Sequence, residues 1–447
     1  MPRDHGAVGS PGLRPPLTRR EVMHGALATG ALAAVGAPRR ARAAAAGRAR
    51  RSAAAGSKPL HVAVVGAGAF GGWTALWLRR LGARVTLVDA WGPGNSRASS
   101  GGETRVIRGM YGAAEVYTRW VVRSFALWRE TARATGLELY HPTGALWMFR
   151  GDDAYARSSL PILEAAGLAL ERLEPAEAGR RFPQVDLGGV RSVWLEPEAG
   201  YLTARRACAA VARLLEAEGG ERRRAAAAPG PVRSGRMGSV RLSDGTELAA
   251  DAFVFACGPW LGELFPEAVG ERIRPTRQEV FFFGPPAADP RFAEGGLPVW
   301  IDFGERIFYG IPGNEDRGFK VADDTHGEPI DPTTLERRPD PAALERARGL
   351  LRERFPALAE APLLESRVCQ YENTRDGHFL IDRHPEAADA WLVGGGSGHG
   401  FKLGPAVGER VALQVLGREE PMADFALERL DRLEGPARSQ LETGEGP

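Results

Sequence analysis

Three glycines and one acid near the start of the chain have the types and spacing of a site for phosphates and a ribose. Gly66, Gly68 and Gly71 form a Gly-x-Gly-x-x-Gly pattern, and Asp89 follows further along. The first glycine permits a tight turn, the second lets the backbone approach a pyrophosphate, and the third allows a helix to pack on a strand. Asp89 is placed to accept a hydrogen bond from an adenosine ribose hydroxyl. The alternative is a plain glycine-rich turn, but the context favours a dinucleotide.

That context is a strand, a helix and a second strand. A β-branched apolar run at residues 61–65 predicts a buried parallel strand, and a helical pattern of apolar residues follows the glycines. Gly82 ends the helix, and a second apolar strand, residues 84–88, leads to Asp89. The N-terminus of the helix would present unpaired N–H groups and a positive dipole end to the phosphates.

Two arginines and two lysines are further candidates for chemistry. Arg105 and Arg108 lie three apart, so on a helical turn both guanidinium groups would face one side and suit a carboxylate or phosphate. The alternative is a pair of solvated surface arginines. Only three of the 58 Lys and Arg residues are lysines. Lys320 and Lys402, the two outside the N-terminal segment, indicate tasks that need a compact ammonium group, although drift alone could leave two.

The bulk composition is that of a globular protein with room for two domains. The chain has 447 residues, of which 43% are hydrophobic and 26% charged. Positive charge is concentrated in the first 58 residues, so the remainder carries no strong basic patch and nucleic acid is not an expected partner. Three cysteines cannot make a disulfide framework, and their spacing fits no zinc or other metal site. One of them is a candidate reactive thiol.

The first 57 residues are interpreted as an export leader and linker. Arg19 and Arg20 precede a modest apolar run, residues 22–37, and an Ala-x-Ala site at 41–43. This resembles a twin-arginine export signal, which predicts a periplasmic or extracellular protein. The run is too short for a transmembrane helix, so stable membrane insertion is not expected. The alternative is a disordered alanine-rich tail on a cytoplasmic protein.

The body of the chain begins and ends with a strand–glycine–helix pattern, and the segment between them has a different pattern of elements. A buried strand at 251–258 extends the parallel sheet, and residues 390–416 repeat the order of strand, glycine turn and helix. Between them, residues 279–311 hold short aromatic-rich strands of an antiparallel sheet. Earlier in the chain, residues 115–135 predict a helix, residues 139–149 read as a hairpin or strand pair, and the turn at 243–245 predicts a hairpin. The prediction is an α/β fold in which a Rossmann-like nucleotide-binding domain (58–142, 198–272 and 367–430) alternates with an α+β substrate domain (143–197 and 273–366), with a tail at 431–447.

Four blocks of the sequence resemble the monomeric sarcosine oxidase family of flavin-dependent amine oxidases, within the D-amino-acid-oxidase-like fold. They are residues 66–89, 102–108, 369–382 and 397–402, and the resemblance extends from residue 60 to about 420. The resemblance implies FAD, held by the opening βαβ unit and by the glycine turn that contains Gly398 and Gly400. It also implies a thioether between Cys369 and the flavin ring; a buried core cysteine is the alternative.

The resemblance also assigns roles at the reacting end of the cofactor. Lys320 matches the lysine that assists the reaction of the reduced flavin with O2, and Arg105 matches an arginine beside the ring. Arg108 and Lys402 match the pair that binds the substrate carboxylate. The remaining matches are two tyrosines of the substrate pocket, Tyr309 and Tyr371, and a histidine of the glycine turn, His399.

The sequence departs from the family at two positions on the substrate side. The family has a histidine where Gly101 stands and another where Asp324 stands, with His326 two residues away. Sarcosine as the substrate is therefore in more doubt than amine oxidation. The prediction is a monomer that oxidises a secondary amine bearing a carboxylate to an imine and reduces O2 to H2O2, with no general base assigned. The alternatives are a flavin dehydrogenase with another electron acceptor and a flavin-bearing binding protein without turnover.

Overall fold

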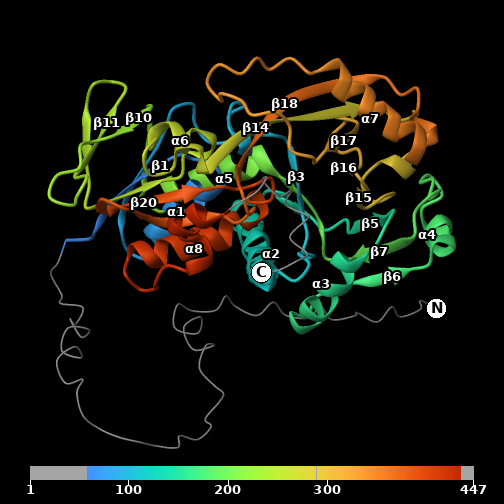
Figure 1. Cartoon of the computed structure of the whole chain (residues 1–447), viewed down its shortest axis with the longest axis horizontal. Coiled ribbons are helices and arrows are strands. Elements are labelled where there is room, and N and C mark those ends of the chain that lie inside the picture. The colour runs from blue at the N-terminus through green and yellow to red at the C-terminus, as the bar shows by residue number, and fades with distance from the viewer. Residues whose placement is uncertain (1–57, 288, 434–447) are drawn as a thin grey trace, which may run out of the picture. The chain divides into compact units, whose positions relative to one another are not determined.

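Two large β-sheets and two small ones hold the strands of the computed structural model, which describes residues 58–287 and 289–433 (Figure 1). The predicted export leader and linker, residues 1–57, lie outside the described residues, as does most of the predicted tail at 431–447.

The first large sheet is built around the opening strand β1 (His61–Val65), which is buried along its whole length. Its neighbours on both sides run parallel to it, and β19 alone pairs antiparallel, at one edge. The order across the sheet is β19 (Leu380–His384), β20 (Ala387–Gly394), β13 (Ala252–Phe255), β1, β2 (Arg84–Asp89) and β9 (Glu221–Arg224). The predicted Rossmann-like unit, with strands from the start, middle and end of the chain, is confirmed.

Helices from both ends of the chain pack together beside this sheet. Figure 1 shows α1 (Ala69–Arg80, blue) next to α8 (Gly404–Val415, red). Glycine at Gly408 makes the close approach possible, because a Cβ there would lie 2.6 Å from the backbone and Cβ of Trp73. Two further helices, α2 (Glu115–Thr135) and α5 (Ala204–Ala217), contribute to the same hydrophobic core.

The second large sheet carries the predicted antiparallel strands. Its one parallel pair, β15 with β5, joins strands that are far apart in the sequence. The order is β18 (Leu363–Thr374), β14 (Ile273–Phe283), β17 (Phe319–Asp323), β16 (Ile307–Ile311), β15 (Val299–Phe303), β5 (Ala145–Phe149), β7 (Ser192–Glu196) and β6 (Glu171–Leu173). Helix α7 (Pro341–Arg354) packs on β14 and β17 in a second core. The remaining α-helices of the described residues are α3 (Ala154–Ala165), α4 (Pro175–Arg181) and α6 (Leu261–Leu264).

The small sheets correct one prediction and confirm another. The strand pair predicted at 139–149 is wrong, because β4 (Tyr140–His141) pairs with β8 (Gly200–Thr203), whereas β5 belongs to the large antiparallel sheet. Both strands were recognised, but each pairs with a segment distant in sequence. The hairpin predicted at 243–245 connects β11 (Ser239–Leu242) and β12 (Glu247–Ala249) as expected. The third strand of that sheet is β10 (Ala227–Pro229).

One compact unit begins at Lys58 and contains both large sheets, so the residue boundaries of the predicted domains stay a prediction. Within the described part of the chain, no helix is both long and apolar enough to cross a membrane. The three cysteines, Cys208, Cys257 and Cys369, are free thiols.

Candidate active site

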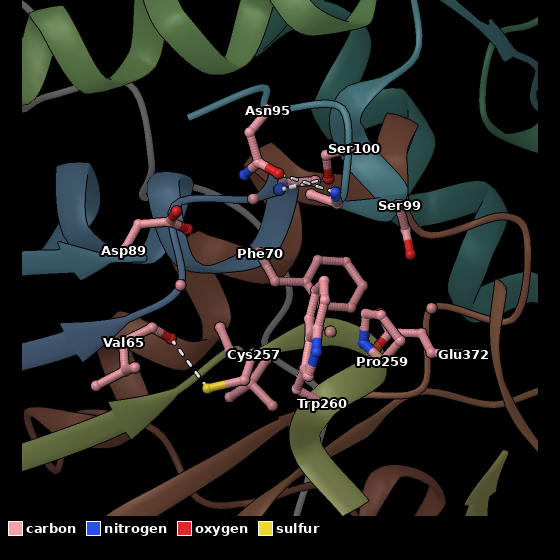
Figure 2. A pocket seen from close by; sticks show the side chains of 18 of the residues that line it. Val65, Phe70, Asp89, Asn95, Ser99, Ser100, Cys257, Pro259, Trp260 and Glu372 are labelled. Carbon is pink, nitrogen blue, oxygen red and sulfur yellow. Dashed lines mark hydrogen bonds between the residues drawn. The ribbon is translucent and has the colours of Figure 1, made fainter. Parts of the chain in front are cut away.

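A first pocket lies at the carboxyl ends of strands β1, β2, β13 and β20 (Figure 2). The volume open to ligand is about 240 Å³, and the walls include Phe70, Cys257, Trp260 and Glu372. The predicted cofactor residues Gly66, Gly68, Asp89, Gly398 and Gly400 also line this pocket. Sequence positions more than 300 residues apart are therefore brought together, as the two strand–glycine–helix units predicted.

The glycine turn leaves no room for side chains where strand meets helix. Gly66 has a φ of +104°, and a Cβ on it would lie 2.2 Å from the Ala256 carbonyl oxygen. A Cβ on Gly71 would lie 1.9 Å from the Gly66 carbonyl oxygen. Gly68 differs, because its nearest neighbour is the Ser100 hydroxyl at 3.3 Å. The packing thus fixes the first and third glycines, whereas the second leaves backbone open to the pocket.

Asp89 ends β2 and ties it to the glycine turn. Its Oδ2 accepts a hydrogen bond from the Ala67 N–H at 2.8 Å, and its Oδ1 accepts from Trp91 and Gly92 at 2.9 and 2.7 Å. A carboxylate can accept about four hydrogen bonds, so one acceptor site is left for a ligand hydroxyl.

A second pocket of about 340 Å³ shares a wall with the first. The residues that line both are Ala98, Arg105, Tyr371, Gly398 and Phe401. The second pocket also receives most of the residues predicted for the reaction and for the flavin ring, namely Arg108, Tyr309, Cys369, His399 and Lys402. Asp324, one of the two departures from the family, lines it as well. A molecule in the first pocket can therefore extend to the chemical groups of the second.

Two buried cations, Arg108 and Lys402, lie close to the aromatic ring of Tyr111. The Arg108 guanidinium carbon lies 4.5 Å and the Lys402 Nζ 5.2 Å from the centre of the Tyr111 ring. Neither cation has a carboxylate within ion-pair distance among residues 58–287 and 289–433. Burial and the Arg108 charge hold the pKa of Lys402 well below its usual value. An anion bound between the two cations would relieve this repulsion.

Arg105 lines the pocket from a strand and not from the predicted helical turn. It lies in strand β3 (Thr104–Ile107), so the helical turn expected to align it with Arg108 is wrong. Both arginines line the second pocket because Arg108 follows the end of the strand. The Arg105 Nη2 donates to the Ser99 carbonyl at 2.6 Å and lies 3.5 Å from the Cys369 sulfur. A cation beside a sulfur is what a reactive thiolate requires.

Lys320 is buried behind the second pocket and lines neither pocket. Its Nζ donates to the Thr104 carbonyl at 3.0 Å and lies 5.4 Å from the centre of the Tyr309 ring. Burial and the nearby Arg105 charge lower the pKa of Lys320 to about 7. The charge of this lysine therefore changes near neutral pH.

His399 is held by two hydrogen bonds. Its Nε2 lies 3.0 Å from the Gly377 carbonyl, which can only accept, so Nε2 carries the proton. Its Nδ1 is then the acceptor for the Tyr111 hydroxyl at 3.3 Å. Burial and the Lys402 charge hold the pKa of His399 well below its usual value, so the ring stays neutral. This geometry suits a positioning role.

The two family departures have different structural settings. A Cβ on Gly101 would lie 1.9 Å from the Asn95 carbonyl oxygen, so the local backbone admits no side chain there. Asp324 is buried, lines the second pocket, and accepts a hydrogen bond from the Tyr371 hydroxyl at 2.6 Å. Burial and the Asp324 charge hold the pKa of Tyr371 well above its usual value, so its hydroxyl remains a donor.

The glycines of the second turn make room for aromatic rings. A Cβ on Gly398 would lie 2.7 Å from the Tyr371 ring, and one on Gly400 would lie 2.8 Å from the Phe70 ring. The positions predicted for cofactor contact thus also position two residues of the pocket walls.

Three residues of the site were missed in the sequence. Tyr111 supports both cations, and Glu372 lines the first pocket. Buried Glu196 accepts hydrogen bonds from the Gly109 and Met110 N–H groups and so fixes the loop after Arg108; burial raises its pKa to about 7. For Glu196, the signal in the sequence was a single acid at the end of an apolar strand. This signal alone does not show whether the carboxyl group is buried or exposed at the edge of the sheet.

The chain matches the family described as FAD dependent oxidoreductase over residues 61–414. It belongs to that family. Monomeric sarcosine oxidase of Bacillus sp. (strain B-0618) is 30% identical over 383 residues, which cover 83% of this chain and 97% of the relative. N-methyl-L-tryptophan oxidase of Salmonella newport (strain SL254) is 27% identical over 83% of this chain and 98% of its own length. The solved structure of L-proline dehydrogenase from P. horikoshii shares the fold, with a TM-score of 0.73 at 22% identity over 84% of this chain and 98% of that one.

The cofactor of this FAD-dependent family fits the first pocket. The Gly66–Gly71 turn offers backbone to the phosphates, and Asp89 keeps one acceptor site for a ribose hydroxyl. The Oε2 of Glu372 is a buried oxygen at the pocket wall without a hydrogen-bond partner among the described residues. These groups would hold the adenosine and phosphate parts of FAD, and the shared wall would let its ring reach the second pocket.

Proposed function

We propose that this FAD-dependent oxidoreductase oxidises a secondary amine that carries a carboxylate, such as an N-methyl or cyclic amino acid. The observation that supports this proposal most directly is the pair of buried cations, Arg108 and Lys402, which line the second pocket, next to the cofactor pocket. Two relatives that cover most of the chain are named as oxidases of N-methyl amino acids, which supports the same class of substrate.

The chain's own residues bind and orient this substrate. Arg108 and Lys402 bind its carboxylate, and the anion raises the pKa of Lys402 and so favours the ammonium form. Tyr309 and Tyr371 line the same pocket and enclose the rest of the molecule. FAD held in the first pocket would supply the two-electron acceptor for oxidation of the C–H bond beside nitrogen, with O2 as the final acceptor, so the products would be an imine, which water hydrolyses, and H2O2.

Asp324 is the residue we assign to the amine. Its carboxylate lines the pocket that contains the two cations, so one wall binds an anion and another accepts an N–H donor. A zwitterionic amino acid has both groups. In this proposal, Asp324 takes the place of the family's histidine and binds the amine group of the substrate.

Cys369 is proposed to form the thioether to the flavin. The support is its place in the second pocket and the Arg105 guanidinium beside its sulfur. Acid precipitation checks this: flavin should stay with the native protein and be freed from Cys369→Ser. Flavin freed from the native protein would exclude the bond.

We further propose that the chain acts as a monomer and is exported. A relative named as monomeric supports the first point, and the twin-arginine pattern at Arg19 and Arg20 supports the second. Fractionation of the source cells and gel filtration of the purified protein test these two points.

A panel of amines tests the function. The holoenzyme is mixed anaerobically with sarcosine, other N-methyl amino acids, cyclic imino acids and matched amines without a carboxylate, and bleaching of the flavin absorption is recorded. Bleaching only by the carboxylate-bearing amines, followed by rapid recovery and H2O2 in air, is the expected result. Recovery only with an artificial acceptor would favour a dehydrogenase, and no bleaching by any amine would favour a binding protein.

A further inference from the structure

The carboxyl group of Glu372 is a buried polar group that amine oxidation leaves unused. Glu372 is 8% exposed and lines the first pocket, where Figure 2 shows it beyond Pro259 and Trp260. Its Oε2 has no hydrogen-bond partner in the described part of the chain. A buried oxygen left unpaired is destabilising, so its position at the wall of a ligand pocket indicates a partner on the ligand.

Glycine turns surround this carboxyl group. A Cβ on Gly396 would lie 3.1 Å from Oε1, and Cβ atoms on Gly394 and Gly258 would lie 3.6 and 3.7 Å from Oε2. These turns follow strands β20 and β13, on one side of β1, whereas Asp89 ends β2 on the other side. The two acids therefore stand on opposite sides of the glycine turn that faces the phosphates.

The surroundings favour an uncharged carboxyl group. No arginine, lysine or histidine forms an ion pair with Glu372 among residues 58–287 and 289–433. Burial raises its pKa to about 7, against the backbone N–H groups of Gly396 and Gly395, which lower it. The negative charges of a bound pyrophosphate would raise it further, because nearby like charges disfavour the ionised form. A protonated carboxyl group has one O–H to donate.

We propose that Glu372 binds FAD as a neutral acid and donates a hydrogen bond from Oε2 to an oxygen of the cofactor beyond its adenosine. The inference rests on the family's use of FAD and concerns its retention. Binding of FAD above neutral pH then takes up one proton, which stays on Glu372 in the holoenzyme.

The test compares three variants in a Cys369→Ser background, where a covalent bond cannot retain the flavin. Glu372→Leu removes the donor, Glu372→Gln keeps an N–H donor of similar shape, and Glu365→Gln, on the same strand but outside both pockets, is the control. Each holoprotein is diluted at pH 6 to 9, and the released flavin is measured by its fluorescence.

The expected dissociation constants differ in size and in pH dependence. We expect Glu372→Leu to weaken FAD binding about tenfold or more at pH 6, and Glu372→Gln to stay within about threefold. Above pH 7 the parent should lose affinity, approaching about tenfold per pH unit, whereas Glu372→Gln should lose this dependence. The other ionisable groups of the pocket, Asp89, Arg105, Cys257, Glu263 and Tyr371, are common to all variants.

Two results would overturn the inference: FAD binding in Glu372→Leu equal to that of the parent, or an unchanged pH dependence in Glu372→Gln. The result for Glu372→Gln remains decisive even if Glu372→Leu does not fold. A parent protein that binds no FAD would instead contradict the assignment of the cofactor.

Discussion

Lys320 combines a buried ammonium group with a pKa of about 7, which gives the proposed reaction with O2 a pH dependence. The ammonium is charged below this pH and neutral above it. If its charge assists the transfer of electrons to O2, reoxidation should slow as the pH rises through 7. Stopped-flow mixing of reduced enzyme with O2 at pH 6 to 9 measures this rate.

The variant Lys320→Met should be slower by about 10- to 100-fold at pH 6 and show no inflection near pH 7. Its anaerobic bleaching by substrate is the internal control and should be little changed, because Lys320 lines neither pocket. A variant that reoxidises at the native rate would exclude the assigned role.

Asp324 and its neighbour Asp323 offer a matched pair for testing recognition of the amine. We expect Asp324→Asn to raise the KM of an amino-acid substrate by about tenfold, since a charge-assisted hydrogen bond is lost. Asp323→Asn is the comparison: Asp323 also lines the second pocket, but its carboxylate is held in an ion pair with Arg306, so this change should affect KM less. Steady-state kinetics on the same amine measures both, and equal effects of the two substitutions would refute the assignment.

At the residue scale, sequence reasoning found groups that stand in motifs and missed those that do not. Gly66, Asp89 and Lys402 were recognisable because their neighbours fit a pattern or their type is rare. Glu196 ends an apolar strand and Glu372 lies in a strand of mixed polarity, and the sequence does not show whether such an acid faces solvent or a pocket. Burial, which depends on distant segments, makes them part of the site.

At the element scale, two adjacent glycines of helix α1 are expected to respond in opposite ways to alanine. Gly71→Ala should cost about 3 kcal/mol of stability or more, because its Cβ would overlap the Gly66 carbonyl. Gly72→Ala meets its nearest atom at 3.6 Å and should stabilise the helix by about 0.5–1 kcal/mol. Thermal unfolding of both variants checks this, and equal melting temperatures would contradict the packing.

Elements were predictable where their signal is local, and their pairing was not. The strands around Gly66 and the helix at 115–135 follow from hydrophobic periodicity. The arginine pair was assigned to a helical turn, yet β3 forms there because it pairs with β8, nearly 100 residues later. No periodicity within a four-residue strand records a partner so distant.

At the scale of the whole molecule, the cofactor should stabilise both large sheets together. The first pocket lies at the ends of strands of the parallel sheet, and Tyr371 of β18 in the antiparallel sheet lines both pockets, so a ligand that spans the shared wall contacts residues of both sheets. In Cys369→Ser, free FAD at about 100 times its Kd should add about 2.7 kcal/mol. We expect one calorimetric transition that moves up by about 3 °C; two transitions, of which only one moves, would show that the sheets unfold separately.

Strand β18 supplies residues to both pockets from alternate positions. Cys369 and Tyr371 leave the strand on one face, and Gln370 and Glu372 leave it on the other. Pairing with β14 sets this register from Ile273 opposite Thr374 onward. Deleting one residue from this stretch would turn the sulfur and the phenol away from the second pocket and present an amide and an acid in their place. Evolution can therefore exchange side chains along β18 one at a time, but a change in its length would disable both halves of the site at once.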